Sequence, residues 1–230
     1  MIGIICAMEV ELESVKESLR DVREESALGF HFYLGQIGKK EVVMVQCGIG
    51  KVNAAVCCQT MILRYHPDCI INTGVAGSLS KNLQVTDIVV AESTVEHDMD
   101  TSPIGDPVGY ISGLNTVYVP CDEQIAKGIF NAANTLEGIH AVLGRIASGD
   151  QFVTSGQRKA WIVENFHADA VEMEGASISH VCRLSDTPCA VLRSISDSTD
   201  DQHQMEFAEF VVVASKNAAR VLTAYITSLN

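Results

Sequence analysis

The chain has 230 residues, of which 47% are hydrophobic, and it carries a formal net charge of −13 at pH 7. This length and composition suit one α/β domain over residues 1–230 with a sizeable core and do not require a second domain. The acidic balance argues against nucleic acid and anionic membranes as partners, because both are themselves negatively charged.

The N-terminal half alternates short apolar runs with helical patterns. The run Ile2–Cys6 predicts a buried strand, and the start of the chain lacks the basic segment of a signal peptide and the length of a membrane span. An amphipathic helix is predicted over 8–22. Residues 30–37 and 41–46 are separated by "GKK" and predict a β-hairpin, and residues 53–63 predict a helix.

The C-terminal half continues the alternation. Strands are predicted over 69–72, 87–91, 141–147 and 189–195, with the segment "NTGVAGSLSKN" as a loop after the first of them. Helices are predicted over 157–165 and 173–184. The last helix is indicated most clearly, because apolar residues from Phe207 to Leu229 recur at steps of three and four.

Strands that alternate with helices predict an α/β fold, with a central mixed and mostly parallel sheet flanked by helices. Ligands of such sheets bind beyond the carboxyl ends of the strands. Small and acidic residues follow the predicted strands in the segments "AMEVE", "TGVAGS", "SGDQF", "EMEG" and "SDSTD". We therefore expect a site where these segments converge. Residues 101–113, the longest loop-like stretch, are a candidate substrate-facing loop or subunit contact.

Three carboxylates stand out among these segments. Glu11 falls at the edge of the apolar stripe of the 8–22 helix, so it is the acid of the first turn expected to face inward. Glu172 and Glu174 lie at a strand-to-helix junction, where a buried carboxylate is costly unless something binds it.

Ser196 and Asp197 follow the last predicted strand and open a polar loop. Two interpretations remain open. The pair stands at the mouth of the site, or it caps the following helix, because Ser and Asp both favour the cap position.

Other patterns indicate no cofactor or metal. "GIGK", residues 48–51, lacks the spacing of a phosphate loop and of a dinucleotide-binding loop, so its glycines are expected to shape a tight turn. "HDMD", residues 97–100, has no second cluster at metal-ligand spacing. The eight cysteines form no C-x-x-C pair and are interpreted as reduced thiols of a cytoplasmic protein.

The segments "IICAMEVELE", "CGIGKVNAA", "INTGVAGSL", "SGDQF", "VEMEGASISHVC" and "RSISDSTD" occur in the order and approximate spacing of the purine nucleoside phosphorylase/uridine phosphorylase superfamily. Within it, the chain most resembles the bacterial 5′-methylthioadenosine/S-adenosylhomocysteine nucleosidases. The resemblance spans residues 2 to about 222 and implies a nucleoside phosphorylase-like fold. It also implies hydrolysis of the N-glycosidic bond of an adenine nucleoside, a small-molecule substrate, no cofactor and a homodimer.

The resemblance implies a role for each site residue. Asp197 would protonate adenine N7 with Ser196 orienting it, Glu11 would hold and activate the attacking water, and Glu174 would accept hydrogen bonds from the ribose hydroxyls. Met173 would pack on the sugar, Phe152 would stack on the base, and the backbone of Val153 would contact the adenine edge. The remaining substrate-binding residues implied are Met8, Ile49, Phe207, Val75 (where the family commonly has a small polar residue) and Glu172, which is either a direct substrate contact or a satisfied structural carboxylate.

General chemistry agrees with these roles. Glycosidic cleavage passes through an oxocarbenium-like state and needs an acid at the leaving group and a base on the opposite face. A diol in a dry pocket needs an acceptor, and a carboxylate accepts from two donors.

Three alternatives stay open. A phosphorylase would need cations to hold phosphate, for which Lys51 and Arg193 are the candidates near the motifs, whereas Glu11 would repel that anion. A nucleosidase could instead prefer aminodeoxyfutalosine or 5′-deoxyadenosine. A nucleoside-binding protein without turnover would have no use for an acid and base pair.

Overall fold

The computed structural model describes residues 1–197 and 207–229, apart from the side chains of residues 207–209. A mixed sheet of ten strands forms its centre, in the order β10-β6-β8-β9-β5-β1-β4-β3-β2, with β7 beside β6. The strands are β1 (Ile2–Cys6), β2 (Arg20–Ala27), β3 (Phe30–Ile37), β4 (Lys40–Gln46), β5 (Cys69–Ser78), β6 (Ile88–Glu96), β7 (Val119–Pro120), β8 (Ala141–Ser148), β9 (Ala170–Glu172) and β10 (Cys189–Asp197).

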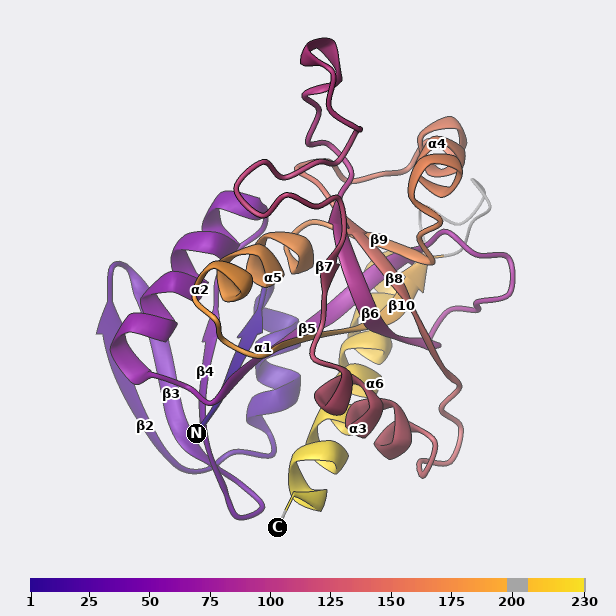
Figure 1. Ribbon diagram of the computed structural model, residues 1–230. Helices are drawn as coiled ribbons and strands as arrows, with labels where there is room; N and C mark the ends of the chain where they lie inside the picture. Colours follow the sequence, from indigo (N-terminus) through magenta and orange to yellow (C-terminus); the bar gives the residue numbers. More distant parts are fainter. Residues whose placement is uncertain (198–206, 230) are drawn as a thin grey trace.

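Helices cover both sides of this sheet (Figure 1). They are α1 (Glu9–Lys16), α2 (Lys51–Tyr65), α3 (Glu123–Ala133), α4 (Gly156–Phe166), α5 (Gly175–Leu184) and α6 (Phe207–Ser228), with a short 3-10 helix η1 (Ser102–Ile104). One side carries α1, α3 and α6, which share a core cluster with β1, β4 and β10. The other side carries α2 and α5, which pack together over β1, β3 and β4. The predicted α/β class with a mixed sheet flanked by helices is confirmed.

Parallel pairing brings the predicted site segments together. β1 lies parallel between β4 and β5, and β5 is also parallel to β10. The strand β10 bonds to β6 as well, so the sheet closes on itself through β5, β9, β8, β6 and β10. Because parallel strands end at the same edge, the residues that follow β1, β4 and β10 meet near the end of β5.

Several predicted boundaries are wrong. The helix predicted over 8–22 ends at Lys16, and residues 20–27 form the edge strand β2 instead. The segment predicted as a loop after Asn72 continues as strand to Ser78, because β10 pairs with it through Gly77. Ser196 and Asp197 are the last residues of β10 rather than part of a loop. The helix predicted from Met173 begins at Gly175.

Two further features of the fold are an additional helix and a long loop. The helix α3 was not predicted, although Asp122 caps it by accepting from Ile125 N–H at 2.9 Å. The chain between β6 and β7, which contains residues 101–113, projects beyond the sheet (Figure 1). None of the described helices is long and apolar enough to cross a bilayer.

Candidate active site

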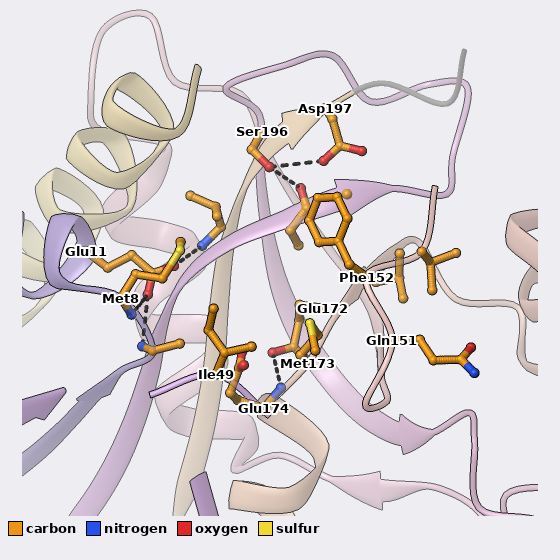
Figure 2. Close-up of a pocket in the computed structure, with 16 residues that line it drawn as sticks. Met8, Glu11, Ile49, Gln151, Phe152, Glu172, Met173, Glu174, Ser196 and Asp197 are labelled. Atoms are coloured by element: carbon orange, nitrogen blue, oxygen red, sulfur yellow. Dashed lines mark hydrogen bonds between the residues drawn. The ribbon is translucent and has the colours of Figure 1, made fainter. Parts of the chain in front are cut away.

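One pocket lies near the ends of the parallel strands and brings together the residues singled out in the sequence (Figure 2). Eleven of the twelve predicted site residues line it. They are Met8, Glu11, Ile49, Val75, Phe152, Val153, Glu172, Met173, Glu174, Ser196 and Asp197. The twelfth, Phe207, opens α6, and its side chain lies outside what the structure describes. Residues 101–113 do not line the pocket within this chain.

The sequence did not point to five other residues that line the pocket. They are Ala7, Ala76, Gly77, Gln151 and Val171. Four of them are small or aliphatic and carry no chemical signal of their own. Gln151 lies inside the quoted "SGDQF" segment, directly before Phe152, so its position after a strand was the available indication.

Glu11 faces inward from the first turn of α1, as predicted, and is only 4% exposed. Its Oε2 accepts the backbone N–H groups of Ala7 and Met8, each at 2.9 Å. Its Oε1 accepts the N–H of Val75 on β5, also at 2.9 Å. The carboxylate lies directly over Gly74, where a Cβ atom would be 2.3 Å from Oε1, so glycine is required there.

The three N–H donors leave Glu11 with capacity for one more. An ionised carboxylate offers about four lone-pair sites, so roughly one remains for a water molecule or substrate hydroxyl. Burial raises the pKa of Glu11 above its usual value, and this outweighs the Arg193 guanidinium and the backbone N–H groups that favour the charged form. A carboxylate with a raised pKa is a stronger base, which suits proton abstraction near neutral pH.

Asp197 approaches the pocket from a different side, at the end of β10 (Figure 2). Ser196 Oγ donates to Asp197 Oδ1 at 3.1 Å, and Lys159 Nζ on α4 lies 3.3 Å from Oδ2. The carboxyl group lies over Gly77, where a Cβ would be 3.0 Å from Oδ2. The helix-cap interpretation depends on the residues that follow Asp197, 198–206, which lie outside the described part of the chain.

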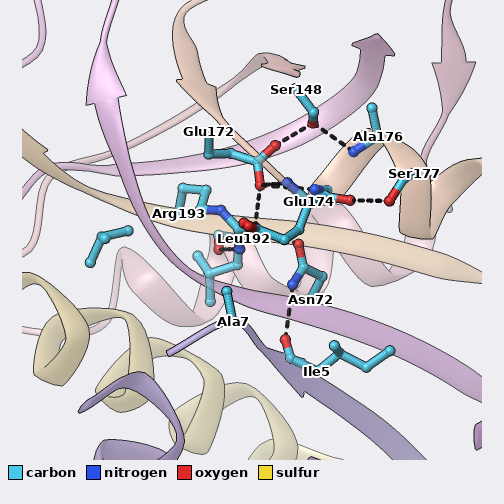
Figure 3. Close-up of polar contacts among 12 residues, drawn as sticks. Ile5, Ala7, Asn72, Ser148, Glu172, Glu174, Ala176, Ser177, Leu192 and Arg193 are labelled. Carbon is cyan, nitrogen blue, oxygen red and sulfur yellow. Dashed lines mark hydrogen bonds and ion pairs between the residues drawn. The ribbon is translucent and has the colours of Figure 1, made fainter. Parts of the chain in front are cut away.

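Glu172 is held by protein groups on both oxygens (Figure 3). Oε1 accepts from Ser148 Oγ, while Oε2 accepts from Arg193 and from the N–H groups of Glu174 at 2.9 Å and Gly175 at 2.8 Å. Burial opposes the ionised form, but these donors outweigh it and hold the pKa of Glu172 below its usual value. Although Glu172 lines the pocket, this geometry favours the structural interpretation over a direct substrate contact.

Glu174 is buried at the pocket floor with fewer partners. Its Oε1 accepts the N–H of Gly50 at 2.8 Å, and its Oε2 lies 3.8 Å from Arg193. Burial, reinforced by the neighbouring Glu172 charge, raises the pKa of Glu174 to about 8. This pKa favours a protonated Glu174 near neutral pH, whereas hydrogen bonds from two hydroxyl donors would favour its ionised form.

This raised pKa predicts a pH-dependent stability. The folded state binds the Glu174 proton more tightly than the unfolded chain, whose carboxyl has the ordinary value of 4.5. The stabilisation of the folded state by proton binding at Glu174 is therefore fully present below about pH 4.5 and is lost as the pH rises toward 8. We expect the melting temperature of the ligand-free protein to fall more steeply between pH 5 and 8 in the wild type than in Glu174→Gln. Parallel melting curves for the two proteins would contradict this assignment.

The cations suggested for phosphate are both engaged elsewhere. The Lys51 ammonium lies 2.6 Å from Asp98 and 3.0 Å from Glu96. Arg193 is 1% exposed and bonds to Glu172 and to Asn72 Oδ1. Gly48 and Gly50, at φ of +84° and +98°, form the tight strand-to-helix turn predicted for "GIGK". In the described part of the chain, no group of three or more His, Cys, Asp or Glu residues is arranged to hold a metal ion.

Comparisons with known proteins agree with this architecture. The phosphorylase superfamily matches residues 1–227. The 5′-methylthioadenosine/S-adenosylhomocysteine nucleosidase of Shewanella pealeana is 35% identical over 229 residues, covering 99% of this chain and 99% of that protein. The aminodeoxyfutalosine nucleosidase of Helicobacter pylori is 38% identical over 231 residues, covering 99% and 98%. The structure of the Neisseria meningitidis nucleosidase with methylthio-immucillin-A superposes with a TM-score of 0.95 at 37% identity, covering 99% of each chain.

Proposed function

This chain belongs to the phosphorylase superfamily, and from that premise we propose that it is an N-glycosyl hydrolase that releases adenine from an adenine nucleoside. The observation that carries the proposal is the placement of two carboxyl groups in one pocket. Glu11, on α1, is fixed there by three backbone N–H groups, and Asp197 lies at the end of the strand β10. Hydrolysis needs such a pair, with one group acting on the water and the other on the leaving base.

In the proposed reaction, Asp197 donates its proton to N7 of adenine while Ser196 holds its other oxygen. The C1′–N9 bond breaks, its electron pair leaves with adenine, and C1′ becomes oxocarbenium-like. A water held by Glu11 attacks C1′ and gives its proton to that carboxylate. Glu174 accepts hydrogen bonds from the ribose hydroxyls, which explains why a carboxylate is tolerated at the pocket floor.

The two carboxyl groups occupy different places along β5. Glu11 lies over Gly74 and Asp197 over Gly77, three residues further along the strand. This arrangement suits a reaction in which one group acts on the water and the other on the leaving base.

Phosphate is disfavoured as the nucleophile. A phosphorylase must hold a dianion beside C1′ with cationic groups. Here Glu11 occupies that side of the pocket, and the charges of Lys51 and Arg193 are paired with carboxylates.

The substrate inferred is a nucleoside such as 5′-methylthioadenosine or S-adenosylhomocysteine, because relatives with these names span the whole chain. Aminodeoxyfutalosine is the second candidate, because a relative of equal coverage carries that name. The test is adenine release, followed by chromatography, from each of these nucleosides and from 5′-deoxyadenosine at equal concentration. Release from at least one is expected. Tight binding of all of them without any adenine formed would favour a non-catalytic nucleoside-binding protein.

We also infer a homodimer. One face of α2 presents exposed apolar side chains at Val52, Val56 and Leu63, and Ile49 continues this face to the pocket rim. Their spacing places them on one side of the helix, where solvent exposure is costly and a second copy would bury them. The double substitution Val52→Glu and Val56→Glu is expected to give a folded 24.8 kDa monomer in sedimentation. A wild-type protein that already sediments as a monomer would contradict the dimer.

A further inference from the structure

Three segments of the chain meet beside the pocket at Lys51. Lys51 is the first residue of α2 and follows the turn that carries Ile49 and Gly50. Its backbone N–H donates to Asp150 Oδ1 at 2.8 Å. Its ammonium group donates to Asp98 Oδ1 at 2.6 Å, in the segment that follows β6.

A third hydrogen bond closes these contacts into a ring. The backbone N–H of Asp150 donates to Asp98 Oδ2 at 2.8 Å. We call these three residues, Lys51, Asp98 and Asp150, the Lys51 ring. Asp98 is the junction, because one of its oxygens accepts from the Lys51 side chain and the other from the Asp150 backbone.

The ion pair between Lys51 and Asp98 is largely shielded from solvent, whereas Asp150 is exposed. The side chains of Lys51 and Asp98 are 18% and 17% exposed. The Lys51 ammonium also contacts Glu96 Oε2 at 3.0 Å, and Glu96 Oε1 lies 2.9 Å from His180 Nδ1 on α5. Hydrogen bonds between charged groups in such partly desolvated surroundings are stronger than those of exposed ion pairs.

None of the three ring residues lines the pocket, yet Asp150 and Lys51 lie one and two residues from Gln151 and Ile49, which do line it. Asp150 directly precedes Gln151, Phe152 and Val153, which form one wall of the pocket. On the other side of the ring, Gly50 N–H holds Glu174 Oε1, the carboxylate at the pocket floor. The ring therefore ties the wall that carries Phe152 to the turn that supports Glu174.

We propose that Lys51, Asp98 and Asp150 are positioning residues that preset the Phe152 wall for the base of the substrate. This inference rests on the proposed function for the identity of the base, adenine. The ring holds the Phe152 wall in its binding geometry before the substrate arrives, so binding does not have to order that segment. It predicts an effect on base binding and a much smaller effect on the chemical step, because Glu11 and Asp197 keep their own contacts.

The first test compares Lys51→Met, Lys51→Arg and a control, Lys127→Met, which opens an exposed ion pair with Glu123 on α3. Lys51→Met is expected to raise KM for the cleaved nucleoside and the dissociation constant of adenine by about tenfold or more, the usual effect of losing charged hydrogen bonds. The value of kcat should change far less. Lys51→Arg should recover most of the affinity, and Lys127→Met should match the wild type.

A second pair of variants separates the ring from a general loss of charge. Asp150→Asn keeps an Oδ1 acceptor for the Lys51 N–H and should bind adenine nearly as the wild type does, whereas Asp150→Ala removes that acceptor and should weaken binding.

Hydrogen exchange needs no substrate, so it tests the ring even if no nucleoside is cleaved. Lys51→Met should speed exchange of the amides over residues 149–154. Unchanged exchange and unchanged adenine affinity in Lys51→Met, or a fall in kcat as large as the rise in KM, would overturn the proposal.

Discussion

Replacing Asp197 by asparagine is expected to lower kcat for adenine release by roughly 100- to 10,000-fold, the range attributed to general acid catalysis. Asparagine preserves the size of the side chain and leaves an oxygen for Ser196 Oγ, which now contacts Oδ1 at 3.1 Å. It has no acidic proton to give to the base, so adenine would have to leave as an anion. The affinity for free adenine should change much less than kcat.

A matched control is available in Asp186→Asn, because Asp186 is exposed and does not line the pocket. This variant should have wild-type activity. If Asp197→Asn also kept wild-type turnover, the acid would have to be assigned to another group.

The second large effect is expected from Glu11→Gln, which should lower kcat by roughly 100- to 10,000-fold through loss of the base. The amide has only one acceptor oxygen, so it can serve Val75 N–H or the pair from Ala7 and Met8, but not both. Some loss of stability should therefore accompany the change. Activity must be measured per folded molecule, with the melting temperature recorded for the same samples.

Glu13→Gln is the control for this prediction, because it makes the same chemical change on the exposed side of the same helix. It should leave kcat unaltered. A Glu11→Gln enzyme that folds and cleaves at the wild-type rate would remove Glu11 from the mechanism and reopen the choice of nucleophile.

The sequence correctly predicted the strands and helices whose apolar residues are the ones that the fold buries. Ile2–Cys6 is uniformly apolar and lies as a central strand buried along its length. The residues of β2, "RDVREESA", are mostly charged and exposed, as is typical of an edge strand, and carry no apolar alternation. The helix predicted over 8–22 therefore extended too far, into the start of β2. Beyond Asn72, the glycines of β5 predicted a loop, whereas pairing with β10 and, at its end, with β9 makes this segment a strand.

The candidate site was predicted better than the elements that carry it. Glu11 was found from helical periodicity, and the structure places it inward as expected. The partners of Glu172 could not be foreseen, because Arg193 and Ser148 reach it from separate strands. The Lys51 ring was missed for the same reason, since its three residues are joined only by the fold.

The most direct test of the central claim is to incubate the protein with 5′-methylthioadenosine in phosphate-free buffer, then add phosphate, and separate the products by chromatography. Hydrolysis by water held at Glu11 predicts equal amounts of adenine and free methylthioribose without phosphate, and no change of rate or product when phosphate is added. Adenine release that begins only with phosphate and yields methylthioribose 1-phosphate would contradict hydrolysis and the role given to Glu11.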